Sequence, residues 1–186
     1  MTGVANDAVA FQVLDGEQAI GHLAELRTLY LEVYAEPPYE WGEEHADLFV
    51  GRFKVQAEQE GFALVEARQG IELVGMAFGV TLLPGTPWWH NLVAPLPKEM
   101  TEERPSRTFA VVELLVRKAW RRQHIAQTMH ELLLSNRPQE RATLTVLPAA
   151  LPAQRAYAKW GWQKVGQKRN PLPGGAVFDV LVRGLG

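Results

Sequence analysis

A lone carboxylate and a group of cations are the residues of this sequence whose types and spacing could do chemistry. Glu113 is the one charged residue in FAVVELLV, an apolar run typical of a buried strand. Burial disfavours the charged form of a carboxylate, so a glutamate among apolar neighbours tends to have a raised pKa. Glu113 is therefore a candidate general base, acting directly or through a water molecule. The alternative is a strand glutamate that reaches solvent or pairs with an arginine.

Four cations follow the same strand within six residues: Arg117, Lys118, Arg121 and Arg122. An amphipathic helix without an obvious capping residue is predicted next, and it ends near Asn136. A helix N-terminus already presents unpaired N–H groups and the positive end of the helix dipole, so added positive charge there predicts a bound anion. The alternative is that the arginines are solvated surface residues.

The composition limits what that anion can be. The chain has 186 residues, a formal net charge of −2 and 22% charged residues, which are ordinary values for a globular protein. A nucleic-acid partner needs a basic domain or face, so the net charge opposes one and favours a small anion. The chain has no cysteine, which excludes a disulfide, a thiolate metal site and a cysteine nucleophile.

The histidines and apolar segments predict neither a metal site nor a membrane segment. The histidines lack the spacing of paired ligands on one helix face; His124 and His130, for example, are six residues apart. No apolar stretch approaches the ~20 residues that span a bilayer. Residues 1–11 do not read as a signal peptide. We therefore expect a cytoplasmic protein with no metal and no membrane partner.

The elements that must position these residues follow the order β-α-α-β-β-β-α-β-α-β-β, which predicts one mixed α/β domain over residues 1–186. Asp15 can cap the first helix, whose apolar positions run to Val33. The predicted strands are 8–14, 61–68, 71–83, 107–116, 142–147, 162–169 and 176–185, and the later helices are 43–60, the one ending near 136, and 152–161. Residues 84–106 form a 23-residue connection with five prolines. Such a connection is usually a lid, a binding loop or disordered.

Two motifs in the second half of the chain match a known family. RRQHIA (121–126) follows the pattern Arg/Gln-X-X-Gly-X-Gly/Ala, except that His124 holds the first glycine position. AYAKWGWQKVG follows the pattern Tyr-X-X-X-Gly-aromatic with Tyr157, Gly161 and Trp162. Over residues 107–185 the sequence therefore resembles the GNAT superfamily of acyl-CoA-dependent N-acyltransferases. The resemblance implies a central, twisted, mostly antiparallel sheet flanked by helices.

The resemblance also implies an activity. It is the direct transfer of an acetyl or other short acyl group from acetyl-CoA to a primary amine of a small molecule or peptide. The family often uses a strand glutamate as base, here Glu113, and a tyrosine that protonates the departing thiolate, here Tyr157, which could instead pack its helix onto the sheet. The implied cofactor-binding residues are Leu115, Val116, Arg121, Arg122, Gln123, His124, Ile125, Ala126 and Gln127.

His124 is the main departure from the motif. Glycine lets a backbone approach a phosphate closely and adopt a positive φ. A histidine costs little if the position is helical and is strained if φ is positive. Its ring could point toward the phosphates or face solvent. The departure favours an alternative of another class, a non-catalytic module that binds acyl-CoA for sensing or assembly.

Aromatic residues in two loops are candidates for the acceptor site. They are Tyr39, Trp41, Trp88 and Trp89, with carboxylates beside them at Glu36, Glu40, Glu43, Glu44, Glu99, Glu102 and Glu103. Aromatic faces and carboxylates suit a cationic amine. The tryptophans could equally pack the long loop down or form a contact in a homodimer, and the acids could be a solvated rim.

Overall fold

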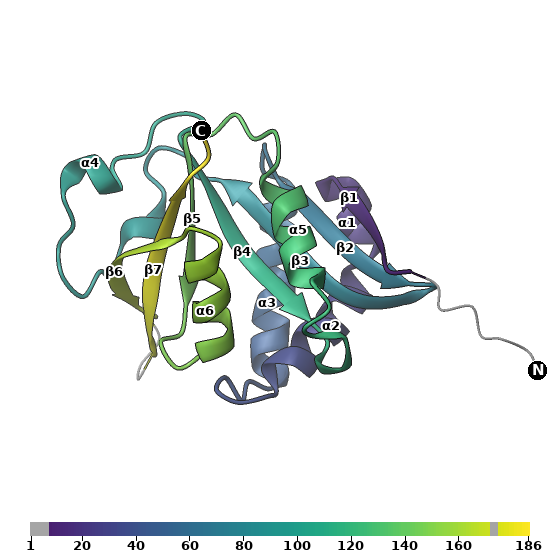
Figure 1. Cartoon of the computed structure of the whole chain (residues 1–186). Coiled ribbons are helices and arrows are strands. Elements are labelled where there is room, and N and C mark those ends of the chain that lie inside the picture. Colours follow the sequence, from purple (N-terminus) through teal and green to yellow (C-terminus); the bar gives the residue numbers. More distant parts are fainter. Residues whose placement is uncertain (1–7, 172–174) are drawn as a thin grey trace, which may run out of the picture. The chain divides into compact units, whose positions relative to one another are not determined.

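The computed structural model describes residues 8–171 and 175–186, and Figure 1 follows the chain through them. The interpretation of residues 1–11 lies largely outside these ranges. The chain divides into two compact units. The first consists of the residues up to Gly79 together with Glu113–Ser135, and the second of Val80–Val112 together with Asn136–Gly186. A single domain over 1–186 stays a prediction.

Among its described residues, the first unit holds two whole strands, most of a third, the end of β4 (Thr108–Val116) and four α-helices. Its strands β1 (Ala10–Leu14), β2 (Ala63–Gln69) and β3 (Glu72–Thr81) pair antiparallel in that order. Its helices are α1 (Gly16–Gly21), α2 (Leu23–Tyr34), α3 (Glu43–Ala57) and α5 (Ile125–Leu134). In Figure 1, α5 crosses the front of these strands while α2 and α3 lie behind them.

The predicted first helix is in fact two helices. Asp15 caps α1 through a capping box with Gln18, as expected. The helix stops at His22, whose φ of −101° and ψ of 3° interrupt the regular geometry between α1 and α2. The His22 ring bonds to Glu66 of β2 at 2.7 Å. Local periodicity did not predict the break.

Aromatic and aliphatic side chains pack the first unit. Tyr30 of α2 stacks on Phe49 of α3 with ring centroids 4.5 Å apart, and both are almost fully buried. On β3, a side-chain carbon at Gly75 would lie 3.0 Å from the Leu115 carbonyl oxygen and from the Met129 side chain. A glycine at this position therefore allows α5 to approach the strands closely.

The second unit is built around the first part of β4 (Thr108–Val116) and strands β5 (Arg141–Val146), β6 (Gln163–Arg169) and β7 (Val177–Gly184). β4 and β5 pair in parallel, as a strand–helix–strand crossover requires. β5 pairs antiparallel with β7, and β7 with β6. Helix α6 (Leu151–Lys159) lies between β5 and β6 in the chain. The mixed α/β class with mostly antiparallel strands is confirmed.

The 84–106 connection belongs to the second unit and packs against β6. It contains a 3-10 turn, η1 (Pro87–Trp89), and one short helix, α4 (Lys98–Thr101). Its backbone bonds to β6 twice: the Val93 N–H donates to Gln167, and the Arg169 N–H donates to Asn91, each at 2.9 Å. Within the described ranges, no helix is long and apolar enough to cross a membrane.

Candidate active site

Glu113 lies buried in the first unit, near the C-terminal end of β4. The residue is 7% exposed. The Tyr34 hydroxyl, from the last turn of α2, donates to Glu113 Oε2 at 2.5 Å. Burial raises the pKa of Glu113 to about 7, against the hydrogen bond from Tyr34 and the charge of Arg52, which lower it. A carboxylate that titrates near neutral pH has the property that a general base needs.

An aromatic cluster surrounds Tyr34, whose hydroxyl bonds to Glu113. The Tyr34 ring lies 4.7 Å from the ring of Tyr39 and 4.7 Å from that of Trp41, and the Tyr39 and Trp41 rings lie 5.1 Å apart. Burial, and then the charge of Glu113, raise the pKa of Tyr39 to about 12. The structure thus brings the predicted acceptor residues Tyr39 and Trp41 close to the predicted base.

Sequence reasoning missed Tyr34. It ends the apolar stripe of α2, one helical turn after the buried Tyr30, and so it reads as a core aromatic. The signal that could have found it is its place at the helix end, next to the aromatic loop that carries Tyr39 and Trp41.

The turn after β4 does not lead directly into an α-helix. A 3-10 turn, η2 (Lys118–Trp120), comes before α5, which begins only at Ile125. Arg122 and His124 adopt positive φ values of 64° and 61°. His124 is the N-cap residue of α5, and its side chain makes no capping hydrogen bond. Of the two alternatives for His124, the strained one is therefore observed, and the first N–H groups of α5 have no side-chain cap.

Replacing His124 by glycine should relieve that strain. A non-glycine residue in the left-handed region loses about 1–2 kcal/mol, while a new glycine costs roughly 0.4–1 kcal/mol through the entropy of the unfolded chain. We expect His124→Gly to raise the free energy of unfolding by up to about 1 kcal/mol in urea denaturation without ligand. His124→Ala is the control, since it keeps the side-chain carbon that causes the strain. A glycine variant no more stable than the alanine variant would contradict this prediction.

Two of the four clustered cations already have partners in the first unit. Arg121 forms a bidentate pair with Glu36, with both N–O distances at 2.9 Å. Arg117 pairs with Glu32 at 2.8 Å. Lys118 and Arg122 are exposed and form no ion pair with any residue in the described ranges. Arg122 is thus better placed than Arg121 to meet an anion, which the sequence did not distinguish.

The other predicted cofactor residues lie on β4 and around the start of α5. Leu115 and Val116 are buried at the end of β4, and Ile125 is buried at the start of α5. The Gln123 side chain donates to the Ala119 carbonyl at 3.3 Å. Ala126 follows in the first turn of α5, and Gln127 donates to Glu131 at 2.9 Å.

Tyr157 and the two loop tryptophans belong to the second unit. The Tyr157 ring is buried on α6 and contacts the rings of Trp160 and Trp162 at 5.8 and 5.9 Å. Lys168 donates to the Trp88 carbonyl, and its ammonium lies 5.3 Å from the Trp88 ring. These contacts agree with the alternative readings, in which Tyr157 packs its helix and the tryptophans pack the loop. The functional roles stay predictions.

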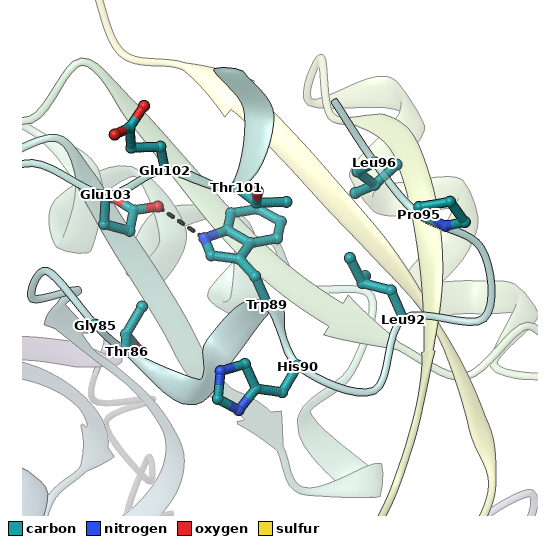
Figure 2. Close-up of a pocket in the computed structure, with 10 residues that line it drawn as sticks. All are labelled: Gly85, Thr86, Trp89, His90, Leu92, Pro95, Leu96, Thr101, Glu102 and Glu103. Carbon is teal, nitrogen blue, oxygen red and sulfur yellow. Dashed lines mark hydrogen bonds between the residues drawn. The ribbon is translucent and has the colours of Figure 1, made fainter. Parts of the chain in front are cut away.

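A cavity of about 550 Å³ opens beside Trp89 within the second unit. Figure 2 shows Trp89 between an apolar side, with Leu92 and Leu96, and an acidic side, with Glu102 and Glu103. The Trp89 indole N–H donates to Glu103 Oε1 at 2.9 Å, whereas Glu103 Oε2 is buried without a hydrogen-bond partner among the described residues. The cavity volume lies within the range of about 300–1,000 Å³ typical of small-molecule sites.

Comparison with known proteins decides the family. The model of the "Acetyltransferase (GNAT) family" matches residues 23–162. The chain belongs to the GNAT family. No curated protein matches this GNAT family member. Among the described residues, no group of three or more acidic, histidine or cysteine side chains could hold a metal ion.

Solved structures share the fold of this GNAT family member at low sequence identity. PH1933 from Pyrococcus horikoshii OT3 is 18% identical, with a TM-score of 0.65 over 94% of this chain and 98% of that chain. The PaiA N-acetyltransferase from Thermoplasma acidophilum, in complex with coenzyme A, is 12% identical, with a TM-score of 0.61 over 95% and 99% of the chains. The ribosomal-protein-S18-alanine N-acetyltransferase from Escherichia coli is 14% identical, with a TM-score of 0.62 over 96% and 94% of the chains. The predicted GNAT-like fold is confirmed.

Proposed function

We propose that this GNAT family member transfers an acetyl group from acetyl-CoA directly to a primary amine, with Glu113 as the general base. The observation that carries the proposal is the buried Glu113 carboxylate, which accepts a hydrogen bond from Tyr34 at 2.5 Å and whose pKa burial raises to about 7. A buried carboxylate that titrates near the working pH suits proton removal from an amine.

The proposed reaction makes one bond and breaks one. The amine nitrogen attacks the thioester carbonyl carbon, the N–C bond forms, and the C–S bond breaks as the thiolate departs. Glu113 takes the proton of the amine directly or through a water molecule. A backbone N–H of β4 polarises the carbonyl, and Tyr157 returns a proton to the thiolate. A serine nucleophile is not required.

The proposed coenzyme A site runs from the end of β4 to the start of α5. Leu115 and Val116 would hold the pantetheine arm through their backbone. The uncapped N–H groups at the start of α5 and the exposed Arg122 suit the pyrophosphate, because both present positive charge without a side-chain partner. Acetyl-CoA supplies the activated acyl group.

The acceptor is proposed to be an amine on a small molecule or peptide. Tyr39 and Trp41 pack against the ring of Tyr34, whose hydroxyl bonds to Glu113, and aromatic faces suit an ammonium group. The Escherichia coli structure of the same fold is named for its action on an alanine of a ribosomal protein, so a peptide acceptor stays open. Contact of Trp88 and Trp89 with the acceptor, a homodimer and a cytoplasmic location stay predictions.

A non-catalytic acyl-CoA-binding or sensing module is the second candidate. One feature favours it: His124 departs from the motif by holding a glycine position, with a strained φ of 61°. Binding of acetyl-CoA without turnover would distinguish this candidate from the enzyme.

Thermal unfolding with acetyl-CoA tests both candidates. A ligand at 100 times its Kd stabilises by about 2.7 kcal/mol, which raises Tm by roughly 5–11 °C in a chain of this size. We expect that rise in the wild type, a smaller one in Arg122→Ala, and an unchanged one in the control Arg155→Ala, whose cation lies on α6. No rise at millimolar acetyl-CoA would contradict the coenzyme A site. A rise without thiol release across a panel of amino acids, polyamines, aminoglycosides and peptides would favour the sensing module.

A further inference from the structure

We infer that Tyr34 is a positioning residue for this reaction, because its hydroxyl fixes one oxygen of Glu113 and leaves the other to take the proton of the amine. The inference rests on the proposed function, since it gives Tyr34 a part in that proton transfer. Neither the motifs nor the family match assigns this residue.

The geometry fixes both partners of the hydrogen bond. The Tyr34 hydroxyl donates to Oε2 of Glu113 at 2.5 Å, so Oε1 is the oxygen that can accept a proton from the amine. The Tyr34 ring is itself held on several sides, by Tyr30 at 4.6 Å and by Tyr39 and Trp41 at 4.7 Å each. A phenol held this way keeps its hydroxyl in one place, and the carboxyl group cannot rotate freely about its last bond.

Tyr34 donates whether or not Glu113 is protonated. Burial, and then the negative charge of Glu113, raise the pKa of Tyr34 well above its usual range, so the phenol keeps its proton. A hydrogen bond to a carboxylate is stronger than one to a neutral carboxyl group. The bond therefore lowers the pKa of Glu113 and opposes burial, which raises that pKa to about 7.

Several other titratable or charged groups act on this carboxyl group. Tyr30 from α2 and Tyr39 from the following loop feel the charge of Glu113. Arg52 from α3 lowers the pKa of Glu113 and also bonds to the Tyr30 hydroxyl. Only Tyr34 bonds directly to Glu113 among the side-chain contacts that act on its pKa. Tyr30→Phe is therefore a matched control, because it removes a buried hydroxyl from the same cluster and leaves the bond to Glu113 intact.

The first test is a titration of Glu113 by carbon NMR, with glutamate labelled at the carboxyl carbon and the signal assigned by its absence in Glu113→Gln. We expect Tyr34→Phe to raise the apparent pKa of Glu113 by about one pH unit, since a bond favouring the charged form is lost. Tyr30→Phe should move it by much less. An unchanged or lowered value in Tyr34→Phe overturns the inference.

A second measurement leaves Tyr34 in place, in case the variant does not fold. The chain has four tyrosines, so tyrosine labelled at the carbon bearing the hydroxyl gives a simple spectrum. One signal, assigned to Tyr34, should shift with a midpoint near the Glu113 pKa of about 7 and should not shift in Glu113→Gln. A Tyr34 signal that is insensitive to pH near that midpoint would overturn the inference.

The pH dependence of turnover separates this inference from the proposed function. If Glu113→Gln loses turnover and Tyr34→Phe moves the rising, acidic limb of kcat/KM upward by about one pH unit, both the proposed function and the role of Tyr34 stand. If Glu113→Gln loses turnover but Tyr34→Phe leaves the limb in place, the role of Tyr34 is wrong and the function stands. If Glu113→Gln turns over like the wild type, both are wrong.

Discussion

Changing Glu113 to glutamine should lower kcat for acetyl-CoA turnover by about 10²–10⁴-fold, the range typical for loss of a general base. The amide keeps the shape of the side chain and can still accept from Tyr34, but it cannot take a proton from the amine. In the wild type, kcat/KM should rise with pH through a limb near the Glu113 pKa of about 7. In the variant that limb should vanish.

Glu66→Gln is the matched control for this loss. Glu66 is also a fully buried strand glutamate of the first unit, and it is held by His22 at 2.7 Å and Arg68 at 2.8 Å. Its replacement should reduce stability through the lost pairing, with little effect on kcat. Wild-type kcat in Glu113→Gln would remove Glu113 from the mechanism.

Changing Glu113 to glutamine should also make the folded protein more stable at pH 8. The unfolded state releases the Glu113 proton near pH 4.5, whereas the folded state holds it until about pH 7. Between these values the folded state binds more protons, so stability falls as pH rises. A pKa raised over that interval corresponds to about 3 kcal/mol lost above pH 7. A glutamine at this position carries no charge to bury, so the variant avoids this loss of stability.

Chemical denaturation of the wild type and Glu113→Gln at pH 4 and pH 8 measures this effect. We expect the variant to gain up to about 3 kcal/mol at pH 8 and nearly nothing at pH 4, where both side chains are neutral. A gain at pH 8 together with a loss of kcat is the pattern of a residue kept for its chemistry. If the stability difference between the variant and the wild type is the same at pH 4 and pH 8, burial does not raise the pKa of Glu113.

Local pattern was enough to predict most of the elements and to bring together some residues of the candidate site. The apolar run with a single acid placed Glu113 in a buried strand, and helical spacing placed the apolar faces of α2 and α5. The aromatic residues that follow the first predicted helix pointed to Tyr39 and Trp41. These features depend on neighbours in the chain, which a sequence shows directly.

Two of the features that could not be predicted depend on residues far apart in the chain. Arg121 looked like an anion ligand because Glu36, its partner, lies 85 residues away. Tyr34 looked like part of an apolar stripe because its hydroxyl bonds to a strand 79 residues later. The left-handed backbone at His124 is a local feature of the turn between β4 and α5. The motif left it as one of two alternatives, and the histidine at that position does not decide between them.

The interleaving of the two units has a consequence for how the chain is made. The first unit needs β1 to β3, which are synthesised before Val80–Val112, and also the end of β4 and α5, which are synthesised after it. Until residue 135 is synthesised, the faces of β1 and β2 that α5 contacts have nothing to cover them. A nascent or truncated chain that stops before Glu113 therefore exposes apolar strands without the base or the anion site. Exposed apolar strands of this kind are prone to aggregate.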